Sequence, residues 1–247
     1  MKHLKEKCAG CERTGVNYNK EHVFPKWLIL RTNTNNTKIR WGDKKIPALS
    51  CTIPLCRDCN KAFGKHLESP VKLIFDNLEK GAGISDLDAE LLVRWLWKLE
   101  GLFWHIGNPE GKYSIKYSLR DRVLKNIDEI RSELFIAISL IKNIDATYGD
   151  RPMGIDSHNL HSALFVSGVF SKVAIMTGLN ICKNLIPQNY SIYNLEQNPE
   201  DSKFFFPKEG FYDDTEAVSV SIIASTRITK EHDNIALLVM GKKFHRQ

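Results

Sequence analysis

Two cysteine pairs of the form Cys-x-x-Cys constrain this chain more than any other feature of its sequence. Cys8 and Cys11 form the first pair, Cys56 and Cys59 form the second, and 44 residues lie between them. Four thiolates in this pattern suit a tetrahedral structural zinc ion, which can hold together loops that lack enough hydrophobic core to fold alone. Zinc is favoured over disulfides because the first residues lack the apolar stretch of an export signal. The sequence therefore predicts a zinc-stabilised unit at the front of the chain.

The two remaining cysteines do not belong to such a pattern. Cys51 and Cys182 each lack a partner at metal-ligand spacing. A lone cysteine of this kind behaves as a small apolar residue. Both are predicted to be ordinary buried or half-buried thiols.

Positive charge is concentrated at the front of the chain. Residues 1–66 hold 14 Lys and Arg against 5 Asp and Glu, a net charge of +9. The whole chain has 35 against 29, so the remaining residues hold 21 against 24, a net charge of −3. A basic field attracts polyanions such as nucleic acids. A solvated basic surface without a ligand is the alternative interpretation.

The overall composition is that of a globular protein. Hydrophobic residues make up 43% of the 247 residues and charged residues 26%, which excludes a disordered chain. No run of eighteen apolar residues is present, so no membrane-spanning helix is predicted. We expect a cytoplasmic protein that does not interact with a membrane.

Short apolar stretches and turn residues dominate the first 70 residues. Residues 38–41 and 44–53 flank Gly42-Asp43 and are predicted to form a hairpin whose second arm leads into the second cysteine pair. A helix is predicted from about Arg57, with a break or kink near Pro70. This part reads as a small, loop-rich unit.

The middle of the chain has helical periodicity. Residues 87–104 place apolar residues at helical intervals, with Ser85 or Asp86 available as a cap. A second amphipathic pattern follows Ser118 and ends near residue 145. The aromatic residues at helical spacing in the first pattern are interpreted as core rather than as a base-stacking surface; they are Trp95, Trp97, Phe103 and Trp104.

Beyond Arg151 the chain consists of short runs rich in Val, Ile, Phe and Ser. The alternation in residues 218–221 favours an antiparallel sheet, although residues 159–177 also fit a buried helix. The predicted fold class is therefore α+β: a small zinc-stabilised module, a helical segment and a C-terminal antiparallel β-rich body. We divide the chain into residues 1–75 and 76–247, with helices over about 86–145 and strands over about 159–240.

A second motif lies between and after the cysteine pairs. The run Glu21-His22-Val23-Phe24-Pro25-Lys26-Trp27-Leu28 precedes the second pair, and Asn60 directly follows its last cysteine. This combination resembles the zinc-clipped branch of the HNH (ββα-metal) endonuclease family over residues 8–70. The segments EHVFPKWL and TIPLCRDCN, followed by HLE at 66–68, are similar to stand-alone bacterial HNH proteins.

The resemblance implies a role for each residue of this motif. His22 would be the general base that activates water, a task suited to an imidazole near neutral pKa. Glu21 and Asn60 would be the ligands of a catalytic Mg²⁺ or Mn²⁺, because hard cations prefer oxygen atoms. The family more usually has Asp or His at the position of Glu21. His66 or Glu68 is a further candidate ligand, although a solvated helix residue is the simpler interpretation of each.

One position of the family's pattern has no clear match here. The middle letter of the HNH name marks an Asn that ties down the loop between the strands. The positions where it is expected hold Ser50, Cys51 and Thr52. That supporting role is therefore left unassigned.

These observations predict a metal-dependent endonuclease that hydrolyses DNA phosphodiester bonds. Arg57, Lys61 and Lys65 would contact the phosphate backbone, which carries no base specificity. The C-terminal body would bind a protein partner or an activating signal. By analogy alone, such a protein resembles effectors of antiviral defence against phage and nucleases of mobile elements.

Two other functions are compatible with parts of the sequence. A zinc module that binds nucleic acid without cleaving it would also have a basic surface, and only Glu21, His22 and Asn60 distinguish it from an enzyme. A zinc module that binds proteins would leave the excess positive charge unexplained. The sequence favours the enzyme.

Overall fold

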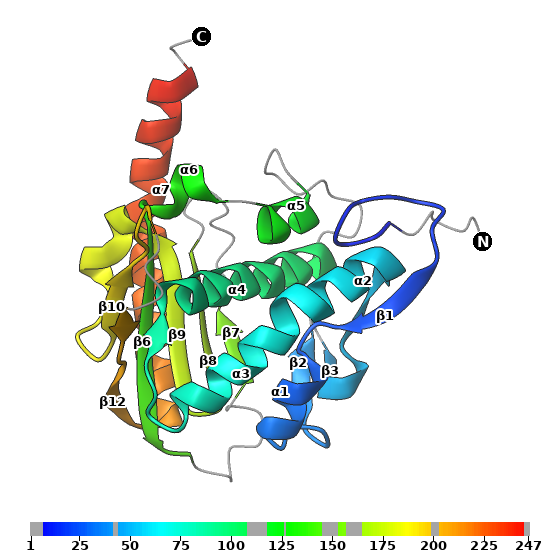
Figure 1. The fold of residues 1–247 in the computed structure, drawn as a ribbon, viewed down its shortest axis with the longest axis horizontal. Helices are drawn as coiled ribbons and strands as arrows, with labels where there is room; N and C mark the ends of the chain where they lie inside the picture. The colour runs from blue at the N-terminus through cyan, green and yellow to red at the C-terminus, as the bar shows by residue number, and fades with distance from the viewer. Residues whose placement is uncertain are drawn as a thin grey trace.

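The structure is a computed structural model, and it describes residues 7–41, 44–107, 118–125, 127–144, 153–156, 165–198 and 203–244. Helices and strands are interspersed along these residues, and Figure 1 shows how they are arranged in space. None of the helices in the described part of the chain is long and apolar enough to cross a membrane. Mixed helix and strand, with a cysteine cluster near the N-terminus, confirms the predicted α+β class.

Two antiparallel strands and a helix form the centre of the front part. Strand β1 pairs with β4 so that Glu21 lies opposite Ile53 and His22 opposite Thr52. Helix α2 follows β4 directly and begins at Arg57, as predicted. The bounds of this ββα unit are β1 Tyr18–His22, β4 Thr52–Cys56 and α2 Arg57–Phe63.

The chain between β1 and β4 forms a separate hairpin. Its strands pair antiparallel across Gly42 and Asp43, which lie outside the described residues. The predicted hairpin is confirmed for residues 38–41 and 44–47, but its second arm does not continue to residue 53, because β3 ends at Pro47 and residues 52–56 pair with β1 instead. The elements of this segment are α1 Lys26–Arg31, β2 Lys38–Trp41, β3 Lys44–Pro47 and the 3-10 turn η1 Ala48–Ser50.

A π-helical turn interrupts the long helix that starts at Arg57. Helix α2 continues into η2 (Gly64–Glu68), which has π-helical bonding, and then into α3 (Ser69–Leu78) with Pro70 in its first turn. Proline has no N–H for the bond to the residue four positions earlier, so the ladder must change there. The predicted break near Pro70 is confirmed. The division suggested after residue 75 falls inside α3.

Helix α4 (Asp86–Gly107) follows a two-residue strand, β5 (Ile84–Ser85), and confirms the predicted helix over 87–104. Ser85 caps it, because its hydroxyl accepts from the N–H of Asp88 (3.2 Å) and the Asp88 carboxylate accepts from the N–H of Ser85 (3.0 Å). Trp95 and Trp97 are fully buried on this helix, as expected for core residues.

The long helix predicted to end near residue 145 is wrong. Only two short helices form, α5 (Leu119–Leu124) and α6 (Asp128–Arg131), and they are followed by strand β6 (Leu134–Asn143). The first six residues of β6 are all buried. A strand covered on both faces is apolar throughout, and such a run cannot be told from a helix by its period.

A six-stranded sheet forms the body of the protein. Its strands lie in the order β10-β6-β9-β8-β7, and β12 pairs with β6 beyond β10 on the same edge. All pairs are antiparallel except β12 with β6. The strands are β7 Met153–Asp156, β8 Val166–Phe170, β9 Val173–Leu179, β10 Ser191–Asn194 and β12 Lys208–Asp213, while β11 (Phe204–Phe205) pairs with β5. The 3-10 segment η3 (Asn180–Leu185) follows β9.

Residues after 213 form a helix rather than the predicted strands. Helix α7 spans Asp214–Phe244 and packs against β8 and β12. The buried residues in its middle recur every three or four positions, and all but Ile228 are small or hydroxylated; they are Ala217, Ser221, Ala224, Ser225 and Ile228. The alternation of Val and Ser at 218–221 was misleading because serines provide part of the packing face. One of them, Ser225, bonds to Ser167 of β8 at 2.8 Å.

Helices cover both faces of the sheet. On one face, Ile136, Ile138 and Ile175 belong to a core that continues through α3 and α4 to the cysteine cluster. On the other face, Phe135 and Met176 belong to a second core that includes the buried side of α7. Figure 1 shows α3 and α4 in front of the sheet and α7 behind it.

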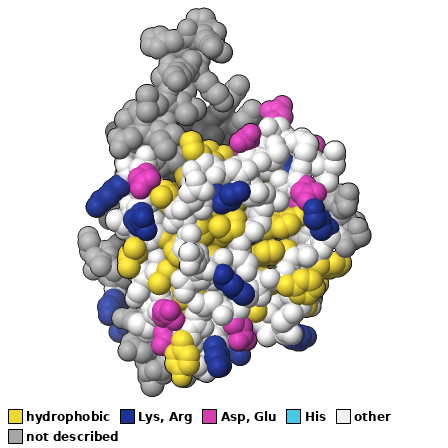
Figure 2. Space-filling view, turned by 90° about the vertical axis from the view of Figure 1, so that its left-hand side faces the viewer, with side chains coloured by type: hydrophobic (Ala, Val, Ile, Leu, Met, Phe, Trp, Pro, Cys, Tyr) yellow, Lys and Arg dark blue, Asp and Glu magenta, His cyan; other side chains and the backbone are white. Residues whose placement is uncertain are grey.

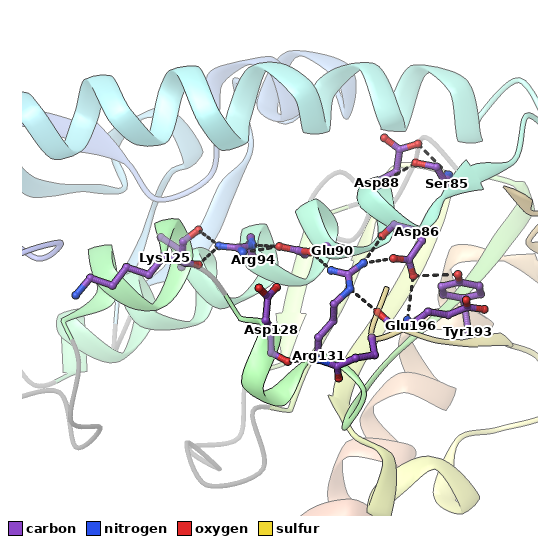
Figure 3. Close-up of polar contacts among 12 residues, drawn as sticks. Ser85, Asp86, Asp88, Glu90, Arg94, Lys125, Asp128, Arg131, Tyr193 and Glu196 are labelled. Carbon is purple, nitrogen blue, oxygen red and sulfur yellow. Dashed lines mark hydrogen bonds and ion pairs between the residues drawn. The ribbon is translucent and has the colours of Figure 1, made fainter. Parts of the chain in front are cut away.

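A network of buried ion pairs fixes the start of α4 to the sheet. Arg131 contacts the carboxylates of Asp86 and Glu90 and donates to the carbonyl of Glu196 at 2.6 Å. Arg94 pairs with Glu90 from the other side. Figure 3 shows these side chains converging between α4, α6 and the loop after β10. The network anchors the helix that also reaches the front part.

The face that carries β10, β12 and η3 has apolar side chains interspersed with Lys and Arg (Figure 2). Exposed apolar residues on these elements include Ile181, Ile192 and Tyr212. Apolar residues scattered in this way are ordinary on protein surfaces.

Candidate metal centre and active site

The four paired cysteines meet at one point. Their sulfur atoms all lie within 4.8 Å of one another, and Cys11 Sγ lies 3.8 Å from Cys56 Sγ. A tetrahedral ion with 2.3 Å bonds to sulfur separates its ligands by about 3.8 Å. The cluster therefore has the dimensions of a structural zinc site. Within the described ranges, no other group of His, Cys, Asp or Glu side chains comes together in this way.

The chain approaches the cluster closely. A Cβ atom on Gly10 would lie 3.0 Å from Cys59 Sγ, so a larger residue at this position would press on a metal ligand. The N–H groups of Cys56 and Cys59 donate to the sulfurs of Cys8 (3.1 Å) and Cys56 (3.4 Å). Backbone donors of this kind stabilise negative sulfur.

The charge of the sulfurs also fits a cation. A hydrogen bond with Cys59 lowers the pKa of the Cys8 thiol to about 4 and raises the pKa of Cys59 far above its ordinary value. Sulfurs this close cannot all ionise unless a positive charge lies among them. Arg13 and Arg120 add donors, at 3.2 Å from Cys11 Sγ and 3.7 Å from Cys59 Sγ. Sequence reasoning did not identify these two arginines.

Glu21 and Asn60 lie in direct contact within the ββα unit. Asn60 Nδ2 of α2 donates to Glu21 Oε2 of β1 at 2.8 Å. The carboxamide oxygen, which is the atom that binds cations, is not used in this bond. A carboxylate and an amide from residues 39 positions apart in the sequence thus lie side by side, and both are half-buried.

A buried lysine completes this group. Lys98 of α4 is fully buried, and its Nζ lies 3.0 Å from Glu21 Oε1 and 2.6 Å from Glu68 Oε1. The other oxygen of Glu68 accepts from Trp27 Nε1 at 3.0 Å. Burial disfavours the ammonium, but Glu68 and Glu21 outweigh that effect and raise the pKa of Lys98. The lysine is therefore a fixed positive charge.

Lys98 was absent from the candidates drawn from the sequence. It lies within the apolar stripe of α4, three residues after Trp95 and four before Leu102. A charged residue at such a position is almost never fully buried unless it is paired. That position was the available signal, but its partners come from β1 and η2 and could not be identified from the sequence.

His22 is the last residue of β1 and is half-buried. Its Nδ1 atom is buried and makes no hydrogen bond. Neighbouring residues on a strand point to opposite faces, so the geometry of β1 alone does not direct this ring towards Glu21. The structure thus brings Glu21 and Asn60 together and leaves the buried nitrogen of His22 without a partner.

The predicted phosphate contacts lie on one exposed stretch. Arg57 and Lys61 are exposed on α2, and Lys65 is exposed on η2. The spacing of four residues places side chains on the same side of a helix. These residues form an accessible basic strip next to the ββα unit.

The two candidate extra ligands have different surroundings. Glu68 is committed to Lys98 and Trp27, as described above. His66 is exposed and lines a cavity of about 410 Å³ between η2, α4 and α5, together with Arg94 and Arg120. No contact joins His66 to Glu21 or Asn60 among the described residues.

The two remaining cysteines are buried, as predicted. Cys51 is fully enclosed and Cys182 nearly so. Burial raises the pKa of each thiol to about 11. Neither is part of the metal cluster.

No protein-family model, curated protein or solved structure matches this chain. The assignment of a function therefore depends on the residues and their geometry.

Proposed function

We propose that this chain is a metal-dependent nuclease of the HNH (ββα-metal) type that hydrolyses phosphodiester bonds of DNA. The observation that carries the proposal is the contact between Glu21 and Asn60, which joins β1 to α2 directly beside the cysteine cluster. Two strands, a following helix and a stapling metal ion are the parts that this family combines. The sequence motif includes both residues of this contact.

The oxygen-rich group fits a hard divalent cation. Glu21 offers a carboxylate oxygen and Asn60 an amide oxygen, which are ligands that Mg²⁺ and Mn²⁺ prefer. Such a cation would neutralise charge that develops on a phosphate during hydrolysis. The structural zinc would be held by Cys8, Cys11, Cys56 and Cys59, and its role would be to fix the segment before β1 to the junction of β4 and α2.

His22 is the proposed general base. It follows Glu21 directly in the sequence of β1, and its buried Nδ1 lacks a partner. An unpaired buried nitrogen costs about 1–3 kcal/mol, and such atoms are concentrated at functional sites. Substrate binding would have to bring the ring and the reacting water into hydrogen-bond distance.

The basic strip of Arg57, Lys61 and Lys65 would position the DNA backbone. Contacts of this kind are independent of base sequence and weaken with added salt. The body would recognise a protein partner or an activating signal, and phage defence is one setting in which such a nuclease acts.

Plasmid nicking or cleavage in Mg²⁺ or Mn²⁺ tests the proposal. We expect His22→Ala to abolish cleavage while the protein stays folded and keeps one zinc ion per chain. His66→Ala is the matched control, because this histidine is exposed and lines the cavity on the far side of η2; it should retain cleavage.

DNA binding without cleavage under any metal condition would support the alternative, a zinc protein that binds nucleic acid without catalysis. The observation that favours this alternative is that Lys98 already neutralises one oxygen of Glu21. Co-purification from the native host is the control for an activating partner. Cleavage that survives in His22→Ala would contradict the assignment of the base.

A further inference from the structure

The buried triad of Glu21, Lys98 and Glu68 is the most unusual electrostatic feature of the front part. Its three charges come from β1, α4 and η2, and the exposed fractions of the side chains are 17%, 0% and 12%. Isolated charges are rarely buried so completely, since removal from water costs several kcal/mol for each ion. The arrangement therefore calls for an explanation beyond packing.

Each oxygen of the two carboxylates has a defined partner. Lys98 binds Glu21 Oε1 and Glu68 Oε1, Trp27 binds Glu68 Oε2, and Asn60 binds Glu21 Oε2. Both oxygens of Glu68 thus accept from groups of the core, the ammonium of Lys98 and the indole N–H of Trp27. At the edge of the triad, Glu21 Oε2 accepts from the side-chain N–H of Asn60, and its second lone pair and the Asn60 carboxamide oxygen are the atoms offered to a metal ion.

The charges in this place can be counted. The two carboxylates and one ammonium of the triad have a net charge of −1. Without the lysine, the two carboxylates would have a net charge of −2. Two unneutralised carboxylates attract a divalent cation far more strongly than one, because interactions between charges are weakly screened when they are buried. The lysine therefore sets how strongly a metal ion is held.

We infer that Lys98 is a built-in cation that takes Glu68 and one oxygen of Glu21 out of metal coordination and so limits the site to a single, weakly held divalent ion. The inference rests on the proposed function of the same site. It makes Lys98 a positioning residue, because it acts through Glu21 rather than on the substrate. It also excludes Glu68 from the ligands of the native site.

The test measures binding of Mn²⁺ to the full, zinc-loaded chain by the electron paramagnetic resonance signal of free Mn²⁺. Variants alter the charge of the triad in steps. The net charge of residues 21, 68 and 98 is −1 in the wild type, 0 in Glu68→Gln and −2 in Lys98→Met. The double variant Lys98→Met with Glu68→Gln returns it to −1. Arg122→Met is the matched control, because it breaks another buried pair, with Glu100, outside the site.

We expect Mn²⁺ affinity to follow this net charge. Lys98→Met should bind at least about tenfold more tightly than the wild type, Glu68→Gln at least about tenfold more weakly, and the double variant close to the wild type. Arg122→Met should leave the affinity unchanged. Lys98→Met should also unfold at lower temperature without Mn²⁺ and gain more from Mn²⁺ than the wild type does.

The outcomes separate this inference from the proposed function. Mn²⁺ binding that is lost in Glu21→Gln but is equal in wild type, Glu68→Gln and the double variant would overturn the role of Lys98 and leave the nuclease proposal intact. If Lys98→Met does not fold, the comparison of the other three variants still decides the question. Absence of Mn²⁺ binding in every variant would overturn both.

Discussion

At the scale of single residues, this chain places several ionisable groups where water cannot reach them. Lys98, Arg131 and Arg122 are all buried, and each is paired with carboxylates. Removing one partner of such a pair generally costs about 3–5 kcal/mol, because the other charge is left uncompensated. Cys51 and Cys182 are buried in a different way, with no charged partner at all. The two kinds of burial have opposite chemical consequences, since pairing fixes a charge and apolar burial suppresses it.

The buried thiols give a prediction about reactivity. Because burial raises the pKa of Cys51 and Cys182 to about 11, each is protonated at neutral pH, and only the thiolate is nucleophilic. We expect both to resist iodoacetamide in the native protein at pH 8 and to react about tenfold faster per pH unit as the pH rises towards 11. Mass spectrometry of labelled peptides measures the rates.

Denatured protein is the control for labelling, and there all six cysteines should react at similar rates. Rapid modification of Cys51 in the folded protein at pH 8 would contradict its placement in the core.

At the scale of elements, residues close together in the sequence predict where a helix begins. They predict less reliably whether a segment is a helix or a strand. The sequence indicated a start at Arg57 and a cap at Ser85 or Asp86, because capping depends on residues a few positions apart. Strand β6 and helix α7 were assigned the wrong type. Their burial depends on the rest of the fold: both faces of β6 are covered, and serines of α7 pack against β8. The pattern of apolar and polar residues does not show that both faces of β6 are covered or that serines of α7 pack against β8.

The cap of α4 can be tested by itself. Ser85→Ala removes the acceptor for the Asp88 N–H, so we expect the free energy of unfolding to fall by about 1 kcal/mol. Urea denaturation measures it. Ser50→Ala is the control, because Ser50 is exposed in η1, and it should change stability by less than about 0.5 kcal/mol. Equal effects of the two substitutions would show that the cap contributes nothing.

At the scale of the whole molecule, the front part and the sheet share one hydrophobic core. The same cluster contains Cys8, Phe63, Trp95 and Ile175, so it runs from the metal ligands to one face of the sheet. Sequence analysis identified the four cysteines that meet in one cluster, and it named Glu21 and Asn60, which lie in contact. It did not foresee that α4, which it assigned to the body, would contribute Lys98 to the candidate site. Contacts between segments distant in sequence decide this part of the arrangement.

The continuous core predicts cooperative unfolding. We expect a single thermal transition in the zinc-loaded chain, because one hydrophobic core contains described residues from both 1–75 and 76–247. Removal of zinc by a strong chelator should shift that transition to lower temperature as a whole, and Cys56→Ser should act in the same direction. Scanning calorimetry provides the measurement. Two transitions, of which only one responds to zinc, would instead indicate separately folding domains.

Helix α2 connects two kinds of chemistry within one turn. Cys59 and Asn60 are adjacent residues, yet one points into the sulfur cluster and the other reaches Glu21. Their side chains diverge by about 100° around the helix axis. A single inserted or deleted residue between Arg57 and Asn60 would rotate both away from their targets together. Length variation should consequently be tolerated in the stretch between α1 and β2, and hardly at all in this turn.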